Sequence, residues 1–570
     1  MARNMLFDEK LRSACHQSLG IEPRREQMQA AHWLQQRTIV EMETGEGKTL
    51  AVAMAAIQHA TQGHRTFIAT ANDYLASRDA SEMSPFLECF GLKASALCAS
   101  QAQEARCRTY SADIVYGTVR ELGFDTLRDA LRRRKNHRTE RPWVPTFHTI
   151  IVDEADSVLI DDALTPLVIS EPASIISSAK ASLYQWCASQ AREMIKGSDY
   201  LIHSANDQIA LTDQGIAKVI HQPMPISLEQ YQTIDILHAV ERAIDVDTRV
   251  KRNVHYLVRG DQIVLIDEPT GRLAESKQMG GGFHQAIEAK ENLAISVPGS
   301  TAARMTIQEL ANRVTHLCGV TATATEEKRE LSSVYRLRTK RIRRHQASRR
   351  DMLCPLTFRH EQDKLNSVVT ECQSMLLSGR PILIGTRTIE KSEVLATMLR
   401  AAGISPRVLN ARQTQEEASI IALAGQSGQV TVATNMAGRG TDIRLSEEAR
   451  RSGGLHVIIA EPHALARLDR QLAGRCGRQG DPGSVRRFFS SDDAIFEMVG
   501  GIDKPHGLVN RLSGVFTGSY LVTKTAQAQR LASRIQRLQR RQLAEADSRL
   551  ADDLIELGLD PHLDRLELID

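Results

Sequence analysis

The stretch EMETGEGKT (Glu41–Thr49) follows the short apolar run Thr38–Val40 and precedes a helical pattern. Glycines in such a loop let backbone N–H groups approach phosphate oxygens, and the following helix N-terminus favours negative charge. Lys48 is expected to bind the β- and γ-phosphates, and the Thr49 hydroxyl to ligate Mg²⁺. Met42 stands where the usual motif has its first glycine. The residues expected to hold ATP in this loop are Met42, Thr44, Gly45, Glu46, Gly47, Lys48 and Thr49.

A glutamine precedes this loop. Gln27 lies upstream of Lys48 at a separation of 21 residues (48 − 27), and its amide offers both a donor and an acceptor for an adenine edge. Beside a phosphate loop, Gln27 is expected to contact the adenine. By itself it would be an ordinary surface glutamine.

An acidic pair ends an apolar run further along the chain. The stretch IVDEAD (Ile151–Asp156) continues the apolar segment Thr149–Val152. Asp153 is expected to hold Mg²⁺, and Glu154 to orient or deprotonate the attacking water. The alternative is a charged turn, which the upstream phosphate loop disfavours.

Short apolar runs alternate with helical patterns in both halves of the chain. Strand–helix alternation of this kind predicts parallel sheets covered on both faces, with ligands at the carboxyl ends of the strands. We therefore predict an α/β fold with two RecA-like P-loop domains of the superfamily 2 helicase type. The expected strands are Thr66–Ala71, Ile114–Tyr116, Thr149–Val152, Pro381–Ile384, Gln429–Ala433 and Leu455–Ala460.

The second half supplies arginines flanked by glycine. Arg439 lies in TNMAGRGTD, and Arg475 and Arg478 lie in QLAGRCGRQ. Arg475 and Arg478 are three residues apart, so we expect both on one helix face. Guanidinium groups at such positions suit phosphate contacts and stabilise charge that develops on a γ-phosphoryl group. Salt-bridged surface arginines are the alternative.

The remaining chain predicts an α+β insert and a helical end. The insert is expected to contain strands within His203–Thr212 and Val254–Glu268, a helix at Ala179–Lys196 and a joint at Gly280–Gly282. Thr523–Leu557 has the apolar spacing of a long helix.

Composition narrows the class of protein. Of the 570 residues, 42% are hydrophobic and 25% charged, and the net charge of +3 does not by itself argue for nucleic-acid binding. The nine cysteines form no CxxC pair, so neither a zinc site nor a disulfide framework is predicted, and a reducing cytosol is expected. Neither a signal peptide nor an apolar run of about 20 residues is evident. Three basic runs could be solvated helix faces or could contact acidic lipid or nucleic acid: Arg132–Lys135, Lys340–Arg350 and Arg530–Arg541.

Taken together, these motifs resemble the SecA family, the ATPases that drive preproteins through the bacterial SecY channel. RNA helicases share the ATP motifs but lack TPLVIS, DEPTGR, HQAIEAK and IEKSE. The likeness extends over about residues 5–515. It is carried by Glu41–Leu50, Asn72–Ala80, Glu121–Asp129, Asp153–Ser170, Asp267–Arg272, His284–Lys290, Gly385–Glu393, Thr434–Ile443 and Gln471–Gly483.

The resemblance implies a domain plan and a set of partners. Residues 1–170 with 293–337 would form one nucleotide-binding domain, and residues 357–500 the other. Residues 171–292 would form a preprotein-crosslinking insert, and residues 501–570 the start of a helical scaffold. Implied partners are a SecY-type channel and unfolded preproteins, with acidic phospholipid and a second copy of the chain as further candidates. The implied location is the cytoplasm and the cytoplasmic face of the inner membrane.

The resemblance also implies site residues, and it has gaps. Arg439 and Arg478 match the arginines that reach the γ-phosphate, and Asp442 matches the acidic residue of the same motif. The family's TGTA segment is TATA (321–324) here, and Leu164 replaces an arginine. The chain ends at Asp570, so the family's two-helix finger, wing and zinc-binding tail are expected to be missing. Export would then need a partner.

Two other functions stay open. A nucleic-acid helicase on the same core is disfavoured by the insert motifs and by the modest charge. A regulator that binds ATP without turnover is disfavoured because Lys48, Asp153, Glu154, Arg439 and Arg478 are all present.

Overall fold

The structure is a computed structural model that describes most of the chain. Within its described part, no helix is both long and apolar enough to cross a membrane. The described residues are 2–135, 142–171, 178–202, 209–267, 272–274, 279, 281–296, 300–409, 420–421, 423–434, 442–498, 515–556 and 560–563.

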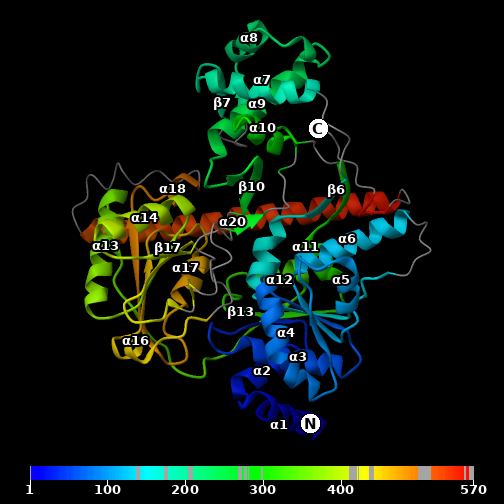
Figure 1. Cartoon of the computed structure of the whole chain (residues 1–570), viewed down its shortest axis with the longest axis vertical. Coiled ribbons are helices and arrows are strands. Elements are labelled where there is room, and N and C mark those ends of the chain that lie inside the picture. The colour runs from blue at the N-terminus through cyan, green and yellow to red at the C-terminus, as the bar shows by residue number, and fades with distance from the viewer. Residues whose placement is uncertain are drawn as a thin grey trace.

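A seven-stranded sheet forms the first lobe, in the order β14-β1-β13-β5-β2-β4-β3, and every pair in it is parallel (Figure 1). Parallel strands need crossover helices, which explains the strand–helix alternation in the sequence. Strand β14 extends this lobe beyond the boundary expected at residue 337. The strands are β1 (Thr38–Glu41), β2 (Thr66–Ala69), β3 (Ala94–Ala96), β4 (Ile114–Gly117), β5 (Thr149–Asp153), β13 (His316–Thr321) and β14 (Arg338–Arg341).

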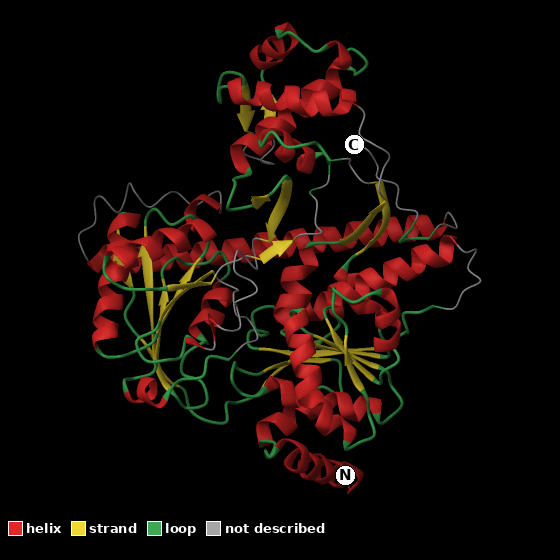
Figure 2. Ribbon diagram, viewed as in Figure 1, coloured by secondary structure: helices red, strands yellow, loops and turns green. Residues whose placement is uncertain are grey.

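Helices cover both faces of this sheet (Figure 2). Neighbouring strand residues point to opposite faces, so Ile151 packs into one apolar core and Ile150 into the other. The first core includes α1 (Ala2–Leu19), α2 (Arg25–Trp33), α3 (Lys48–Ala60) and α4 (Asp73–Glu88). The second includes α6 (Val119–Lys135), α11 (Ile307–Arg313) and α12 (Lys328–Tyr335), while α5 (Gln103–Thr109) leads into β4.

A second seven-stranded parallel sheet forms the other lobe, in the order β15-β21-β20-β17-β19-β18 with β16 beside β21. Its strands are β15 (Arg349–Met352), β16 (Leu356–Phe358), β17 (Ile382–Thr386), β18 (Arg407–Leu409), β19 (Val430–Thr434), β20 (Leu455–Ile459) and β21 (Pro482–Ser490). Its covering helices are α13 (Glu361–Leu377) and α14 (Ile389–Ala401) on one face, and α16 (Glu447–Arg451) and α17 (Ala466–Ala473) on the other. The two predicted parallel sheets are confirmed.

The insert rises from the first lobe on a two-stranded antiparallel stem, β6 (Leu167–Glu171) with β12 (Ser300–Met305) (Figure 1). The segment expected at Val254–Glu268 forms a hairpin that turns at Gly260, whose φ is +57°. Of the expected strand His203–Thr212, residues 203–208 lie outside the described residues. The insert contains α7 (Ser178–Glu193), β7 (Tyr200–Ile202), β8 (Ile209–Leu211), α8 (Asp213–His221), α9 (Thr233–Arg249), β9 (Tyr256–Arg259), β10 (Gln262–Asp267), β11 (Arg272–Ala274) and α10 (Phe283–Lys290).

A single long helix, α20 (Val515–Glu556), runs along both lobes (Figure 1). Gln529 donates to Asp469 of the second lobe at 2.8 Å. About three turns further on, the buried Arg540 binds both carboxylate oxygens of Glu330 in the first lobe, at 2.6 and 2.8 Å. The helix therefore joins the two lobes, with α18 (Ile495–Met498) packed against it.

Candidate nucleotide site between the lobes

The phosphate loop lies where β1 ends at Glu41 and α3 begins at Lys48. Gly45 and Gly47 have φ angles of +90° and +76°, a region that favours glycine. A Cβ atom on Gly47 would lie 2.1 Å from the Gln27 amide nitrogen, so no side chain fits there. The N–H of Met42 donates to the Thr321 carbonyl at 2.9 Å, and this bond anchors the loop to β13. The sequence therefore forms a rigid loop that opens onto a helix N-terminus.

The acidic pair lies directly opposite the loop lysine. Lys48 Nζ lies 2.6 Å from Glu154 Oε1, and both side chains are buried. Glu154 follows the last residue of β5 and has a φ of +58°, which is unfavourable for a residue with a side chain. Its N–H donates to Asp153 Oδ1 at 3.0 Å. Backbone strain of this kind concentrates at functional sites.

The carboxyl of Asp153 is held in an unfavourable state. Its pKa is raised to about 7, chiefly by burial and also by the nearby Glu154 and Asp79 carboxylates, while Lys48 opposes the rise. A cation bound beside such a carboxyl group would stabilise its ionised form. Asp153 and Thr49 both carry oxygen atoms of the kind that Mg²⁺ prefers, so they could hold this ion.

Gln27 contacts the loop itself. Its amide nitrogen donates to the carbonyls of Glu46 and Gly47 at 3.1 and 3.3 Å, and its amide oxygen accepts from the Arg24 N–H at 2.9 Å. Both ends of the amide are thus bound to backbone of the protein. The adenine contact stays a prediction.

Arg478 brings the second lobe to the phosphate loop. A side-chain carbon on Gly45 would meet Arg478 Cβ at 3.1 Å, so the arginine packs on the loop. Its Nε donates to the Gly474 carbonyl at 2.9 Å, and its guanidinium donates to Asp442. The side chain of Arg478 is only 8% exposed.

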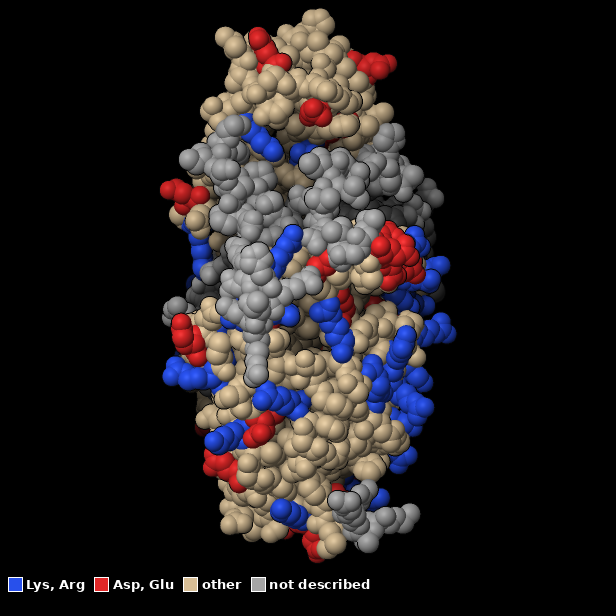
Figure 3. All heavy atoms as spheres, turned by 90° about the vertical axis from the view of Figure 1, so that its right-hand side faces the viewer, with Lys and Arg blue, Asp and Glu red and all other residues tan. Residues whose placement is uncertain are grey.

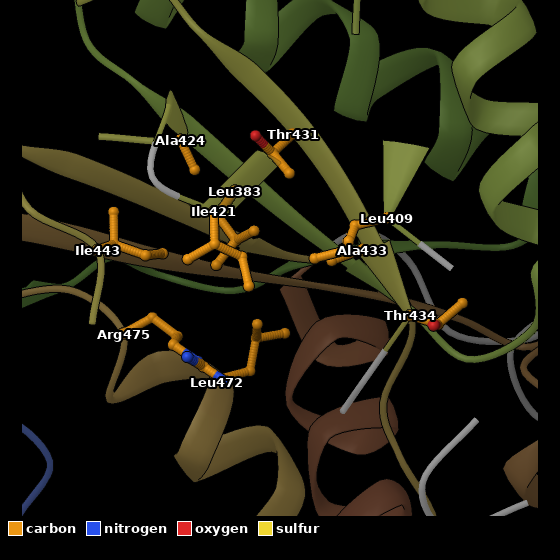
Figure 4. Close-up of a pocket in the computed structure, with 10 residues that line it drawn as sticks. All are labelled: Leu383, Leu409, Ile421, Ala424, Thr431, Ala433, Thr434, Ile443, Leu472 and Arg475. Atoms are coloured by element: carbon orange, nitrogen blue, oxygen red, sulfur yellow. The ribbon is translucent and has the colours of Figure 1, made fainter. Parts of the chain in front are cut away.

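The expectation of two arginines on one helix face is wrong. Helix α17 ends at Ala473 with Gly474 as its C-cap, so Arg475 and Arg478 lie in the turn beyond it. Arg475 instead lines a pocket inside the second lobe with Leu383, Thr431 and Leu472 (Figure 4). Arg439 lies outside the described residues.

The structure also shows a polar network that the sequence analysis missed. Asp156 accepts from the hydroxyls of Thr321 and Thr323 at 2.6 and 2.5 Å. It also accepts from the amide of Gln471, which comes from the second lobe. Each of the three segments belongs to a motif of the sequence. Only the structure shows that they converge and that the Asp156 carboxylate connects the two lobes.

A buried ion pair crosses the same interface. Arg467 of α17 donates through both of its terminal nitrogens to Asp161, one of them at 2.8 Å, and both side chains are buried. Nearby, Arg470 pairs with Glu326, and both of these side chains are partly exposed. The first lobe contributes the acids of this interface and the second lobe the arginines.

These features define the class of protein. Two parallel-sheet lobes are in contact, one with a phosphate loop and an Asp-Glu pair, the other with an arginine, Arg478, packed on that loop. This is a two-lobed P-loop protein with the arrangement of the DEAD-like helicases. Comparison with known protein families supports this class. The family described as the SecA DEAD-like domain matches residues 8–332, and the family described as the SecA P-loop domain matches residues 346–452 and 446–513.

The chain belongs to the SecA family. It is 38% identical to a protein translocase subunit SecA 2 of Rhodopirellula baltica, over 92% of this chain and 84% of that relative. It is also 38% identical to the SecA subunits of Clostridium botulinum and Syntrophus aciditrophicus, over 88% and 86% of this chain. The chain spans 59% and 57% of the length of these two relatives.

Solved structures give more distant matches. The helicase MrfA bound to DNA and AMPPNP has a TM-score of 0.45 at 11% identity, covering 91% of this chain and 56% of that one. Dbp5 of S. cerevisiae bound to RNA has a TM-score of 0.42 at 14% identity, covering 87% and 91%.

Proposed function

We propose that this chain hydrolyses Mg²⁺-bound ATP between its two lobes and couples the reaction to polypeptide translocation through a Sec channel. The observation that carries the ATPase part is the contact of Arg478 with Gly45, beside the Lys48–Glu154 pair. A loop lysine, an acidic pair and an arginine of the second lobe are groups suited to binding a triphosphate and stabilising its transfer.

The residues of the first lobe bind and polarise the substrate. Lys48 pairs with Glu154. A bound phosphate would compete for Lys48 and release the Glu154 carboxylate to orient or deprotonate water. Asp153 and Thr49 would hold Mg²⁺, which neutralises charge on the phosphates.

The second lobe senses the γ-phosphate. Arg478 and Arg439 would stabilise charge that develops on the transferred group, with Asp442 holding the Arg478 guanidinium in place. Loss of the γ-phosphate removes that attraction, so hydrolysis would loosen the two lobes.

The insert supplies a surface suited to unfolded polypeptide. Among the described residues of the insert, six large apolar side chains are exposed, of which Ile226 is the most exposed at 83%. On the face seen in Figure 3 the insert surface, at the top, is mostly uncharged. Exposed apolar side chains gathered on one part of a protein mark interaction sites. The six are Ile195, Leu201, Ile220, Met224, Ile226 and Ile234.

The names of the relatives support the translocation part of the proposal. They are protein translocase subunits, and we propose the same partners here, namely a SecY-type channel and unfolded preproteins. The chain would then work in the cytoplasm and at the cytoplasmic membrane face, with acidic phospholipid and a second copy of the chain as further partners.

Steady-state ATP hydrolysis tests this proposal. The purified chain is assayed alone, with SecY-channel membranes plus an unfolded preprotein, and with single-stranded RNA. Stimulation by the membranes and preprotein, weakened in an Ile226→Ser, Ile234→Ser variant, supports translocation. Stimulation by RNA alone would contradict it in favour of a helicase, and no hydrolysis at all would contradict the ATPase assignment.

A further inference from the structure

Histidine side chains cluster at the edge of the first sheet that lies opposite the candidate nucleotide site. His148 and His316 stand where β5 and β13 begin, His64 lies just before β2, and His59 lies in the last turn of α3. All four lie at the amino-terminal edge of the sheet, whereas the nucleotide site lies at the carboxyl edge. The His64 and His148 rings stack at 3.8 Å between centroids, and the His59 and His316 rings lie 4.5 Å apart.

Three side chains in this group converge like metal ligands. One ligand atom from each of His59, His316 and Cys318 lies within 4.8 Å of the other two. His316 and Cys318 are two residues apart on β13, so they project from the same face of the sheet toward α3. His59 is 4% exposed and Cys318 is fully buried, while His316 is partly exposed and gives access to the group.

One nitrogen of each ring already has a backbone partner. Nε2 of His59 lies 3.3 Å and Nε2 of His316 lies 3.0 Å from the same backbone oxygen, that of Leu34. A carbonyl oxygen only accepts, so both Nε2 atoms carry the proton and both Nδ1 atoms keep a lone pair. Metal-binding histidines are held in the same way, by donating their other N–H to a carbonyl.

The charge states of these groups also suit a metal. Burial lowers the pKa of His59 to about 4, and burial also lowers the pKa values of His316 and His148. A neutral imidazole is the form that binds metals. Burial raises the pKa of the Cys318 thiol, with Arg37 opposing the rise, so the thiol keeps its proton until a cation replaces it.

We propose that His59, His316 and Cys318 form a binding site for one Zn²⁺ ion. Two imidazole nitrogens and one thiolate are ligands typical of a tetrahedral zinc site. On binding, the Cys318 S–H bond is replaced by an S–Zn bond and the proton leaves to solvent. The fourth position would take water or His64, whose Nδ1 is buried and has no hydrogen-bond partner.

The site needs only a small adjustment to close. Zn–N bonds of about 2.1 Å and a Zn–S bond of about 2.3 Å set the ligand atoms about 3.4–3.7 Å apart. From the present limit of 4.8 Å, shifts of about 1 Å are sufficient. The ion would then tie the end of α3 to β13, and Leu34 would hold both rings. This site was not anticipated because no two of its segments form a recognisable motif in the sequence.

Metal binding by the full-length chain tests the proposal. The protein is purified without a metal-affinity tag, treated with a chelator, desalted and titrated with Zn²⁺. We expect one tightly bound equivalent per chain. Titration with Co²⁺ is expected to produce visible d–d bands and a thiolate charge-transfer band in the near ultraviolet. Zn²⁺ should also raise the unfolding temperature.

Two variants and a matched control decide whether these residues bind the ion. Cys318→Ala and His316→Gln should lose the tight equivalent and the unfolding shift, and Cys318→Ala should lose the thiolate band. Cys372→Ala removes another fully buried cysteine, in the second lobe, and should keep all three signals. His316→Gln lies at a partly exposed position and serves if Cys318→Ala fails to fold. Equal zinc binding by all variants, or no tight equivalent in the parent chain, would overturn the proposal.

Discussion

The two lobes have the same architecture and opposite chemistry. Both are seven-stranded parallel sheets covered by helices on both faces. In the first lobe the carboxyl ends of β1 and β5 lead to Lys48, Asp153 and Glu154, whereas the second lobe provides Arg478 from the turn between α17 and β21. Neither lobe is a complete site, so the chemistry depends on their contact.

The interface itself repeats this division. Asp156 and Asp161 of the first lobe meet Gln471 and Arg467 of the second. Charge pairs inside a buried interface depend on close geometry, because both groups have lost their water. We therefore expect substitutions at Lys48, Asp153, Glu154 and Arg478 to act on chemistry, and substitutions at this interface to act on the contact between the lobes.

The largest effect is expected from the catalytic carboxylate of the first lobe. Glu154→Gln keeps the shape of the side chain but removes the base, so ATP hydrolysis should fall about 10³-fold while nucleotide binding persists. Steady-state turnover and fluorescent-nucleotide binding measure the two. Glu104→Gln, an exposed change on α5, is the control. Turnover within tenfold of the parent would remove Glu154 from the mechanism.

The buried ion pair between the lobes should give the next largest effect. Arg467→Gln leaves Asp161 buried without its partner, so we expect a loss of about 3 kcal/mol in the free energy of unfolding. Urea titration followed by tryptophan fluorescence measures it. The partly exposed Arg470→Gln should cost less than about 1 kcal/mol. Equal losses would mean that burial does not distinguish the two pairs.

The arginine of the second lobe should affect turnover somewhat less. Arg478→Lys keeps the charge but loses the planar, multiple-donor geometry, so turnover should fall about 10²-fold. Arg475→Lys is the matched control, and its effect should stay below about tenfold because that side chain lines a pocket of its own lobe. If both variants lose turnover equally, the distinction between the two arginines fails.

The smallest effect is a pH dependence in the first lobe. The pKa of Asp153 is raised to about 7, so the carboxyl gains a proton as the pH falls through 7. Mg²⁺ needs the ionised form, and between pH 8 and pH 6 that form falls about tenfold, so Mg²⁺ affinity should fall about as much. Titrations of Mg²⁺ against nucleotide binding at both pH values measure this.

A matched variant separates the pH dependence caused by Asp153 from that caused by the nucleotide. Asp153→Asn should bind Mg²⁺ weakly with only the pH dependence of the nucleotide itself. The raised pKa of Asp153 also predicts how the stability of the protein depends on pH. Without Mg²⁺, the free energy of unfolding should decline as the pH rises from about 4 to 7, since ionisation is disfavoured in the folded state. Identical pH dependence in the parent and the variant would contradict the assignment.

Much of the site could be predicted because it depends on local pattern. The segment from β1 through the glycine loop to Lys48 is contiguous, and backbone conformation alone requires its glycines. Asp153 and Glu154 end an apolar strand, which by itself places them at the carboxyl edge of a parallel sheet. The six expected strands were found for the same reason, since strand burial leaves a short apolar run in the sequence.

What only the tertiary structure decided concerns residues far apart in the chain. A three-residue spacing placed Arg475 beside Arg478, but α17 ends before both, and the two arginines then face different surroundings. In the sequence Asp156 is only one more acidic residue of its motif. The structure shows that it accepts a hydrogen bond from Gln471 of the other lobe. His59 and Cys318 meet only because a strand and a helix pack together. Local pattern determines which backbone forms, whereas contacts between lobes and across a sheet depend on packing that no single segment encodes.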